Sequence, residues 1–121
     1  ASKTEYLYYL NKGPMVNVNE KMAHDIRRIQ FTNMKYLGDG QSDVPAFATV
    51  KRGDGEDKGG ECIAVYKEHD AKCYVEAVKL YSQKRVHAMA PGDYRSGSEL
   101  RNHLRKGIEQ LAKKIILEKS E

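Results

Sequence analysis

The C-terminal stretch over residues 96–117 constrains the fold most, because it has the pattern of a long amphipathic helix. Ser96 and Glu99 have the spacing of a capping box, in which two side chains satisfy free amides at a helix start. Apolar side chains then recur along one face, namely Leu100, Leu104, Ile108, Leu111 and Ile115. The pattern predicts a helix over 97–118. A stripe of this length must be buried against another layer, which we expect to be a sheet.

Three segments in the middle of the chain supply candidate strands. The segment 44–51 contains Phe47, Thr49 and Val50, and has Pro45 near its start, where a strand tolerates proline. Segments 61–67 and 72–81 are also rich in β-branched and aromatic residues, and they flank a short turn at His69-Asp70. We interpret them as an antiparallel meander that ends in a hairpin. A short strand at 85–89 follows.

The segment 70–84 has a second interpretation. Lys72, Glu76, Lys79 and Gln83 recur at helical spacing, which indicates an amphipathic helix. The strand-prone Cys73, Tyr74, Val75, Val78 and Tyr81 favour the hairpin instead, and we prefer the hairpin. Near the N-terminus, the pattern predicts a strand at 6–10 and a helix at 18–31 that is capped by Asn17.

These elements predict one α+β domain over residues 1–121. It is an antiparallel β-meander with a long C-terminal helix packed on it and a shorter N-terminal helix. The order helix, three strands, helix over residues 18–118 resembles the topology of the double-stranded-RNA-binding domain. That family has a lysine cluster at the start of its last helix, where this chain has Gly97, Ser98 and Glu99. The likeness is therefore one of topology alone.

Both faces of the expected hairpin are apolar. Cys62, Ala64 and Tyr66 alternate with Ile63 and Val65, whereas a one-sided antiparallel sheet has a polar outer face. Either two helices cover opposite faces of the sheet, or a second copy of the chain covers one of them. A homo-oligomer is therefore an open expectation.

Composition excludes several classes of protein. No segment approaches the roughly 20 apolar residues of a membrane span, and the first residues lack the pattern of a secretory signal. Two cysteines are few for a disulfide scaffold, and the four histidines are not spaced for a zinc site. We therefore expect a cytoplasmic protein without a metal, a cofactor or a membrane partner.

Positive charge is concentrated toward the C-terminus. Residues 79–119 carry ten Lys and Arg against four Asp and Glu, whereas residues 1–78 carry eleven against twelve. A basic segment on a nearly neutral body suits an anionic partner, although solubility alone accounts for it equally well.

The candidate site lies where this basic segment enters the last helix. A helix N-terminus offers free amides and a positive dipole end, which suit a phosphate. The residues expected to bind the ligand are Arg95, Ser96, Ser98, Arg101, Arg105, Lys84 and Arg85. Gly-x-Gly occurs at Gly38/Gly40 and at Gly53/Gly55 without the rest of a phosphate loop, and we interpret both as loop glycines.

No catalytic residues are expected, because no arrangement of nucleophile, acid or base stands out in the sequence. We predict a non-enzymatic module that binds a phosphate-bearing ligand, with nucleic acid as the first choice. A protein–protein interaction or inhibitor domain and a binder of a small nucleotide are the alternatives.

Overall fold

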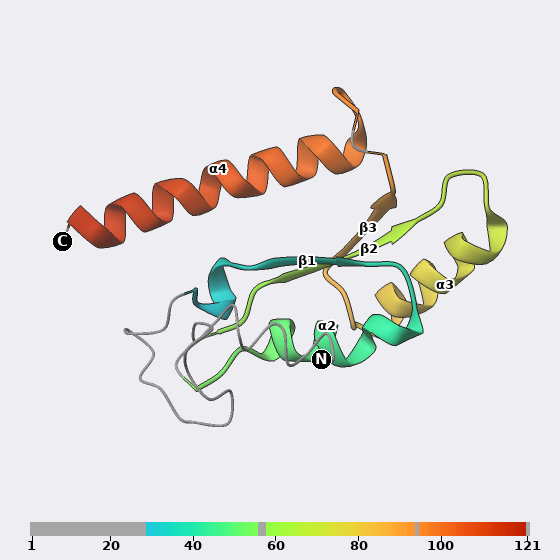
Figure 1. Cartoon of the computed structure of the whole chain (residues 1–121), viewed down its shortest axis with the longest axis horizontal. Helices are drawn as coiled ribbons and strands as arrows, with labels where there is room; N and C mark the ends of the chain where they lie inside the picture. Colours follow the sequence, from blue (N-terminus) through green and yellow to red (C-terminus); the bar gives the residue numbers. More distant parts are fainter. Residues whose placement is uncertain (1–28, 56–57, 94, 121) are drawn as a thin grey trace.

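The computed structural model describes residues 29–55, 58–93 and 95–120. The strand expected at 6–10, and the helix expected at 18–31 except for its last three residues, lie outside the described residues. Within the described ranges, a three-stranded sheet has helices on both of its faces (Figure 1). The order along the chain is η2 (Phe31–Asn33), β1 (Lys35–Gly38), η3 (Gln41–Asp43), α2 (Val44–Arg52), β2 (Glu61–Tyr66), α3 (Ala71–Ser82), β3 (Ala88–Pro91) and α4 (Glu99–Ser120).

The sheet is parallel, so the antiparallel meander was wrong. β1 pairs with β2 from Lys35↔Glu61 to Gly38↔Ala64, and β2 pairs with β3 from Ile63↔Ala88 to Tyr66↔Pro91. The strand order is β1-β2-β3, and each crossover contains a helix, as parallel pairing requires. The topological resemblance to the double-stranded-RNA-binding domain depended on three consecutive strands and does not hold. Only the strand expected at 61–67 matches an observed strand closely.

The segment 44–51 forms helix α2 and not a strand. Asp43 occupies the N-cap position, and Pro45 lies in the first turn, where its fixed φ and missing amide favour a helix start. Ala46, Phe47 and Val50 are buried at helical spacing. Gly53, with a φ of 73°, ends the helix and donates its amide to the carbonyl of Thr49.

The segment 71–82 forms helix α3 and not a strand of a hairpin. The second interpretation of 70–84, an amphipathic helix, is therefore the correct one. The side chain of Asp70 caps it by accepting a hydrogen bond of 3.0 Å from the amide of Cys73. Ala77 and Leu80 are its buried residues. The strand expected at 85–89 overlaps β3 in only two residues.

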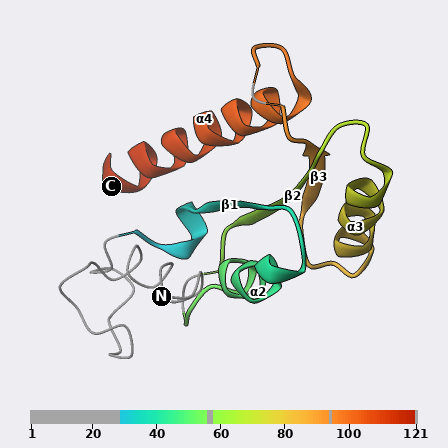
Figure 2. The same cartoon turned by 45° about the vertical axis from the view of Figure 1, so that its right-hand side comes forward.

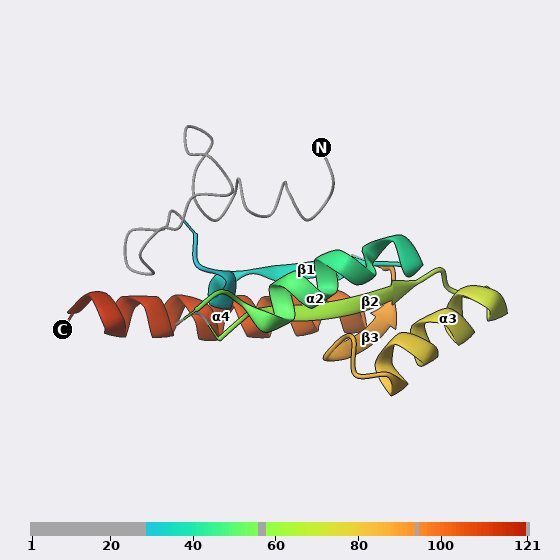
Figure 3. The ribbon, with the colours of Figure 1, turned by 90° about the horizontal axis from the view of Figure 1, so that it is seen from below.

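β2 is buried on both faces because helices cover both. Cys62 and Ala64 point to α2 and α3, in a core that also contains Phe31, Phe47, Val50 and Leu80. Ile63 lies on the other face, in a smaller core with Ala90 and Leu100. Figures 2 and 3 show α2 and α3 on one face of the sheet and α4 on the other. Apolar residues on both sides of β2 thus match a parallel sheet between helix layers.

The long C-terminal helix is confirmed, with a shorter buried stripe than expected. Ser98 and not Ser96 is its cap, because the Ser98 hydroxyl accepts a hydrogen bond of 3.2 Å from the Arg101 amide. Leu100 is fully buried and Leu104 is half-buried. Ile108 is 56% exposed, so its expected place in the core was wrong.

Candidate functional site

All three strands run in the same direction, so their carboxyl ends lie at one edge of the sheet, the carboxyl edge. Three connections start there: Gly38 to Asp43 after β1, Tyr66 to Asp70 after β2, and Pro91 to Ser98 after β3. Open parallel sheets between helices bind their ligands outside this edge. These connections are therefore the places where a ligand site is expected.

The connection after β1 contains two aspartates, and Asp43 is the more constrained. Asp43 is 3% exposed. Although it stands at the N-cap position of α2, its side chain makes no capping hydrogen bond. One carboxylate oxygen accepts a hydrogen bond of 2.8 Å from the hydroxyl of Tyr36, and the other accepts one of 3.0 Å from the amide of Asp39. The carboxylate is thus fixed against the end of β1.

Gly38 and Tyr36 are the neighbours that accommodate the Asp43 carboxylate. A Cβ at Gly38 would lie 2.6 Å from Cγ of Asp43, so a side chain there would displace the carboxylate. Burial and the hydrogen bond to Asp43 raise the pKa of Tyr36, so its hydroxyl stays protonated and keeps donating. The first turn of α2 adds positive potential from its free amides. A buried charge needs such partners, or a metal ion.

Asp39 stands beside Asp43 and is exposed. The hydrogen bond between its amide and Asp43 holds the two residues together at the carboxyl edge. Mg²⁺ keeps several waters and is bound in proteins by one or two carboxylates together with phosphate oxygens of a ligand. Two aspartates fit that arrangement. Among the described residues, no three Asp, Glu, His or Cys side chains are grouped so as to hold a metal by themselves.

The connection after β3 contains three of the residues expected to bind phosphate. Arg95 forms two hydrogen bonds with Asp93, of 2.9 Å and 2.8 Å. These hydrogen bonds lower the pKa of the Asp93 carboxyl to about 2. The Ser98 hydroxyl donates to the Asp93 carbonyl at 2.6 Å, and Ser96 is exposed. Arg95, Ser96 and Ser98 therefore lie close together, with Arg95 and Ser98 engaged in local contacts.

The other expected residues are farther apart. Arg101 and Arg105 are exposed on α4, and Arg105 lies 4.0 Å from Glu109. Lys84 and Arg85 precede β3, so they lie toward the amino edge of the sheet, the edge opposite Arg95. The structure thus brings part of the expected set together and separates Lys84 and Arg85 from the rest.

Asp39 and Asp43 are not among the residues expected from the sequence, although a signal for them is present. Gly38-Asp39-Gly40 follows a short β-prone segment, and Asp43 and Pro45 have the spacing of a helix start. Parallel sheets are built from strands that are each followed by a turn and a helix. The order strand, glycine turn and helix therefore indicates one repeating unit of such a sheet. The β-prone side chains of the segment 44–51 favour a strand and obscure this unit.

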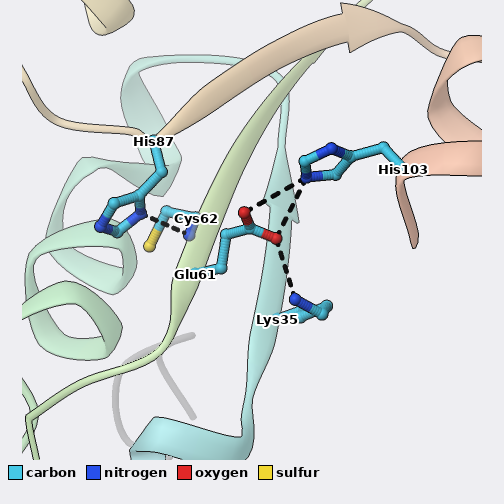
Figure 4. A network of polar contacts seen from close by, with 5 residues as sticks. All are labelled: Lys35, Glu61, Cys62, His87 and His103. Carbon is cyan, nitrogen blue, oxygen red and sulfur yellow. Dashed lines mark hydrogen bonds and ion pairs between the residues drawn. The ribbon is translucent and has the colours of Figure 1, made fainter. Parts of the chain in front are cut away.

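A separate polar network lies at the amino edge (Figure 4). Lys35 at the start of β1 forms a salt bridge of 3.0 Å with Glu61 at the start of β2. His103 on α4 lies 3.2 Å from the other oxygen of Glu61. A Cβ at Gly107 would lie 2.7 Å from Nζ of Lys35, so this glycine makes room for the lysine. The network connects α4 to the sheet beyond Leu100.

The same region contains Cys62 and His87. The amide of Cys62 donates a hydrogen bond of 2.9 Å to Nδ1 of His87. Cys62 and Cys73 carry free thiols, and they lie on β2 and α3, which do not form the expected hairpin. Burial raises the pKa of the Cys62 thiol to about 12, which makes it a poor nucleophile.

Glu61 gives a pH-dependent contribution to stability. Burial alone would raise the pKa of Glu61, but the contacts with Lys35 and His103 outweigh burial and lower it. A lowered folded-state pKa gives stability at neutral pH that is lost as the pH falls through that pKa. We expect Glu61→Gln to cost about 0.5–1 kcal/mol at pH 7, the scale of a partly exposed ion pair.

That difference should shrink toward zero as the pH falls through the lowered pKa of Glu61, below which both proteins are neutral at residue 61. Urea denaturation at several pH values measures it. Glu118→Gln, which removes an exposed acid far along α4, is the control and should show no such pH dependence. An equal cost for Glu61→Gln at all pH values would contradict an ionic role.

Comparison with known proteins finds one informative relative. The chain is 32% identical over 106 residues to a Borreliella burgdorferi protein that is described as uncharacterized. The match covers 88% of this chain and 35% of the relative, so the chain spans about a third of that protein. No family model matches the chain, and no solved structure does. Among the described helices, none combines the length and apolar character needed to cross a bilayer.

Proposed function

We propose that the chain binds a phosphate-bearing ligand together with a divalent cation at the carboxyl edge of its sheet. Asp39 and Asp43 hold the cation, for which Mg²⁺ is the choice that fits two carboxylates and ligand phosphate oxygens. The observation that carries the proposal is the Asp43 carboxylate, which is 3% exposed and fixed by Tyr36 and Asp39 instead of capping α2.

The connection after β3 supplies a second contact for the ligand. Neighbouring strands are about 4.8 Å apart, so the ends of β1 and β3 are separated by about 10 Å. A nucleotide or another small phosphate ester is long enough to reach from the aspartates to Arg95 and Ser96. Arg95 would then exchange its pairing with Asp93 for the ligand.

This proposal changes the expected function in one respect. Mg²⁺ held by carboxylates and phosphate oxygens is the arrangement used in phosphoryl transfer. The sequence alone predicts binding without catalysis, whereas these two aspartates favour the cation-binding part of a phosphotransfer or phosphate-hydrolysis site.

Calorimetric titration tests the proposal with AMP and inorganic phosphate as probes. We expect millimolar Mg²⁺ to tighten their binding by at least about tenfold. Asp39→Asn should remove the Mg²⁺ effect, because it removes one of the two carboxylates that hold the cation. The fold should be kept, since Asp39 is exposed and contacts Asp43 through its backbone amide. Glu109→Gln, which removes one acid on α4, should retain it.

Binding that is indifferent to Mg²⁺ in the parent protein would overturn the cation site. Binding of DNA or RNA that survives Asp39→Asn, but weakens with salt and with Arg101→Ala/Arg105→Ala, would favour the nucleic-acid ligand instead. Hydrolysis of p-nitrophenyl phosphate by the Borreliella protein, with and without Mg²⁺, tests the reaction class.

A further inference from the structure

Helix α3 contacts the turn that contains the two aspartates of the cation site. Gln41 lies in this turn, between Asp39 and Asp43, as the first residue of η3. Its side-chain amide donates a hydrogen bond of 2.6 Å to a carboxylate oxygen of Glu76 on α3. Figure 1 shows the start of α2, which follows this turn, next to α3. The hydrogen bond therefore joins the cation-binding turn to a separate helix.

Glu76 belongs to a firmly packed element. It lies in the middle of α3 and is half-buried. Ala77 and Leu80 of the same helix are buried against β2 and β3. The side chain of Asp70 caps the start of the helix by accepting from the amide of Cys73. A side chain on a packed helix holds its position more precisely than one on a loop, so Glu76 is a suitable anchor.

The turn has less burial to fix it than the helix has. Within residues 39–43, Asp43 is buried, whereas Asp39, Gln41 and Ser42 are exposed. Contacts within the turn include the hydrogen bonds from the Asp39 amide to the Asp43 carboxylate and from the Asp43 amide to the Gly40 carbonyl. The contact with Glu76 adds an anchor from outside the turn.

The chemistry of this pair suits an anchor. A carboxylate only accepts hydrogen bonds, and the amide group of Gln41 donates one, so the bond is charge-assisted. Bonds of this kind are shorter and stronger than those between neutral groups. An exposed hydrogen bond nevertheless adds little to the stability of the whole fold, because water competes for both partners. Its effect should therefore be local, and the turn should adopt fewer conformations.

We propose that Glu76 is a positioning residue of the cation site, which acts through Gln41 to hold Asp39 and Asp43 in the arrangement that binds the cation. This inference rests on the proposed function. A turn that is ordered beforehand loses less conformational freedom when the cation binds, so its affinity is higher. Groups that orient metal ligands change metal affinity by roughly 10–100-fold, and for this exposed pair we expect about three- to tenfold.

The negative charge of Glu76 offers a different explanation for the same effect. A carboxylate near the site attracts a cation whether or not it contacts Gln41. Two substitutions separate the explanations. Gln41→Ala removes the hydrogen bond and keeps the charge, whereas Glu76→Gln removes the charge and keeps an oxygen that can accept from Gln41.

Electron paramagnetic resonance of Mn²⁺, which prefers the same oxygen ligands as Mg²⁺, measures the dissociation constant of the metal alone. We expect Gln41→Ala and Glu76→Ala each to raise this constant by about three- to tenfold. The double variant should be no weaker than either single variant, because both changes remove one shared contact. Glu76→Gln should stay within about twofold of the parent protein, since the hydrogen bond is kept.

Two control variants accompany this titration. Asp39→Asn should abolish Mn²⁺ binding, which shows that the signal comes from the proposed site. Glu68→Ala removes an exposed acid between β2 and α3, and its dissociation constant should match that of the parent protein. The urea denaturation midpoint of Gln41→Ala should also stay close to the parent value, so that a loss of affinity is not a loss of folded protein.

Amide hydrogen exchange reports on the turn without a metal. The Asp39 amide donates to the Asp43 carboxylate, so its exchange rate measures how often the turn opens. We expect this amide to exchange at least about threefold faster in Gln41→Ala and Glu76→Ala than in the parent protein. In Glu76→Gln its exchange should be close to that of the parent protein.

Unchanged Mn²⁺ affinity in Gln41→Ala and Glu76→Ala, with a parent site that Asp39→Asn removes, would overturn the positioning role and leave the cation site in place. Equal losses of affinity in Glu76→Gln and Glu76→Ala would also overturn it, since the charge alone would then account for them. A parent protein that binds no Mn²⁺ would overturn the proposed function and this inference together.

Discussion

Asp43→Asn is expected to abolish the effect of Mg²⁺ on ligand binding while leaving the protein folded. The amide of asparagine removes the charge that holds the cation and leaves a similar shape. One oxygen can still accept from Tyr36 or from the Asp39 amide, but the new NH₂ group faces the other donor. An unsatisfied buried donor costs about 1–3 kcal/mol, so the free energy of unfolding should fall by that amount.

Calorimetric titration with Mg²⁺ and AMP measures binding, and circular dichroism shows that the variant is folded. Tyr36→Phe is the matched control, because it removes one hydrogen bond to Asp43 and keeps the charge. We expect Tyr36→Phe to weaken the Mg²⁺-dependent binding by a factor of about ten or less. Retained Mg²⁺ dependence in folded Asp43→Asn would mean that this carboxylate has only a structural role.

Phe47→Ala should cause the largest loss of stability, about 3–5 kcal/mol, as expected for truncating a fully buried aromatic side chain. Phe47 joins α2 to the sheet. Its ring makes an edge-to-face contact with Tyr36 of β1, with centroids 5.5 Å apart, and its carbonyl accepts a hydrogen bond from the Cys62 thiol of β2. A domain of this size is stable by only about 5–15 kcal/mol, so the variant should be close to unfolding.

Urea denaturation at neutral pH measures this loss. Ile108→Ala on α4 is the control, because Ile108 is 56% exposed and its truncation should cost less than about 0.5 kcal/mol. Equal losses for the two variants would contradict the structure at α2, since they would place Phe47 and Ile108 in equivalent surroundings.

Two elements could be predicted from local sequence. Helix α4 has an apolar stripe at helical spacing and a serine cap, and β2 has a short run of β-branched and apolar residues. In both, propensity and pattern indicate the same structure. The segments that became α2 and α3 contain β-prone side chains in helices, and their start signals were Asp43 with Pro45, and Asp70. Because β-propensity reflects packing more than backbone preference, tertiary burial of one helix face outweighed it.

The candidate site followed from the fold and not from charge. The basic residues predict a site at the start of α4, where the structure shows Arg95 paired with Asp93 and Ser98 engaged as a cap. Asp39 and Asp43 became candidates only after the strands proved parallel, since only then does the end of β1 lie at a ligand-binding edge.

By itself the sequence determined the C-terminal helix, the central strand and the presence of apolar residues on both faces of that strand. These properties depend on the order of side chains along a few turns or a few residues. Only the tertiary structure decided that the strands are parallel, that α2 and α3 connect them, and that Asp43 turns back to Tyr36. The physical reason is that strand direction and the choice between helix and strand depend on contacts between residues far apart in the chain. Local periodicity does not contain those contacts.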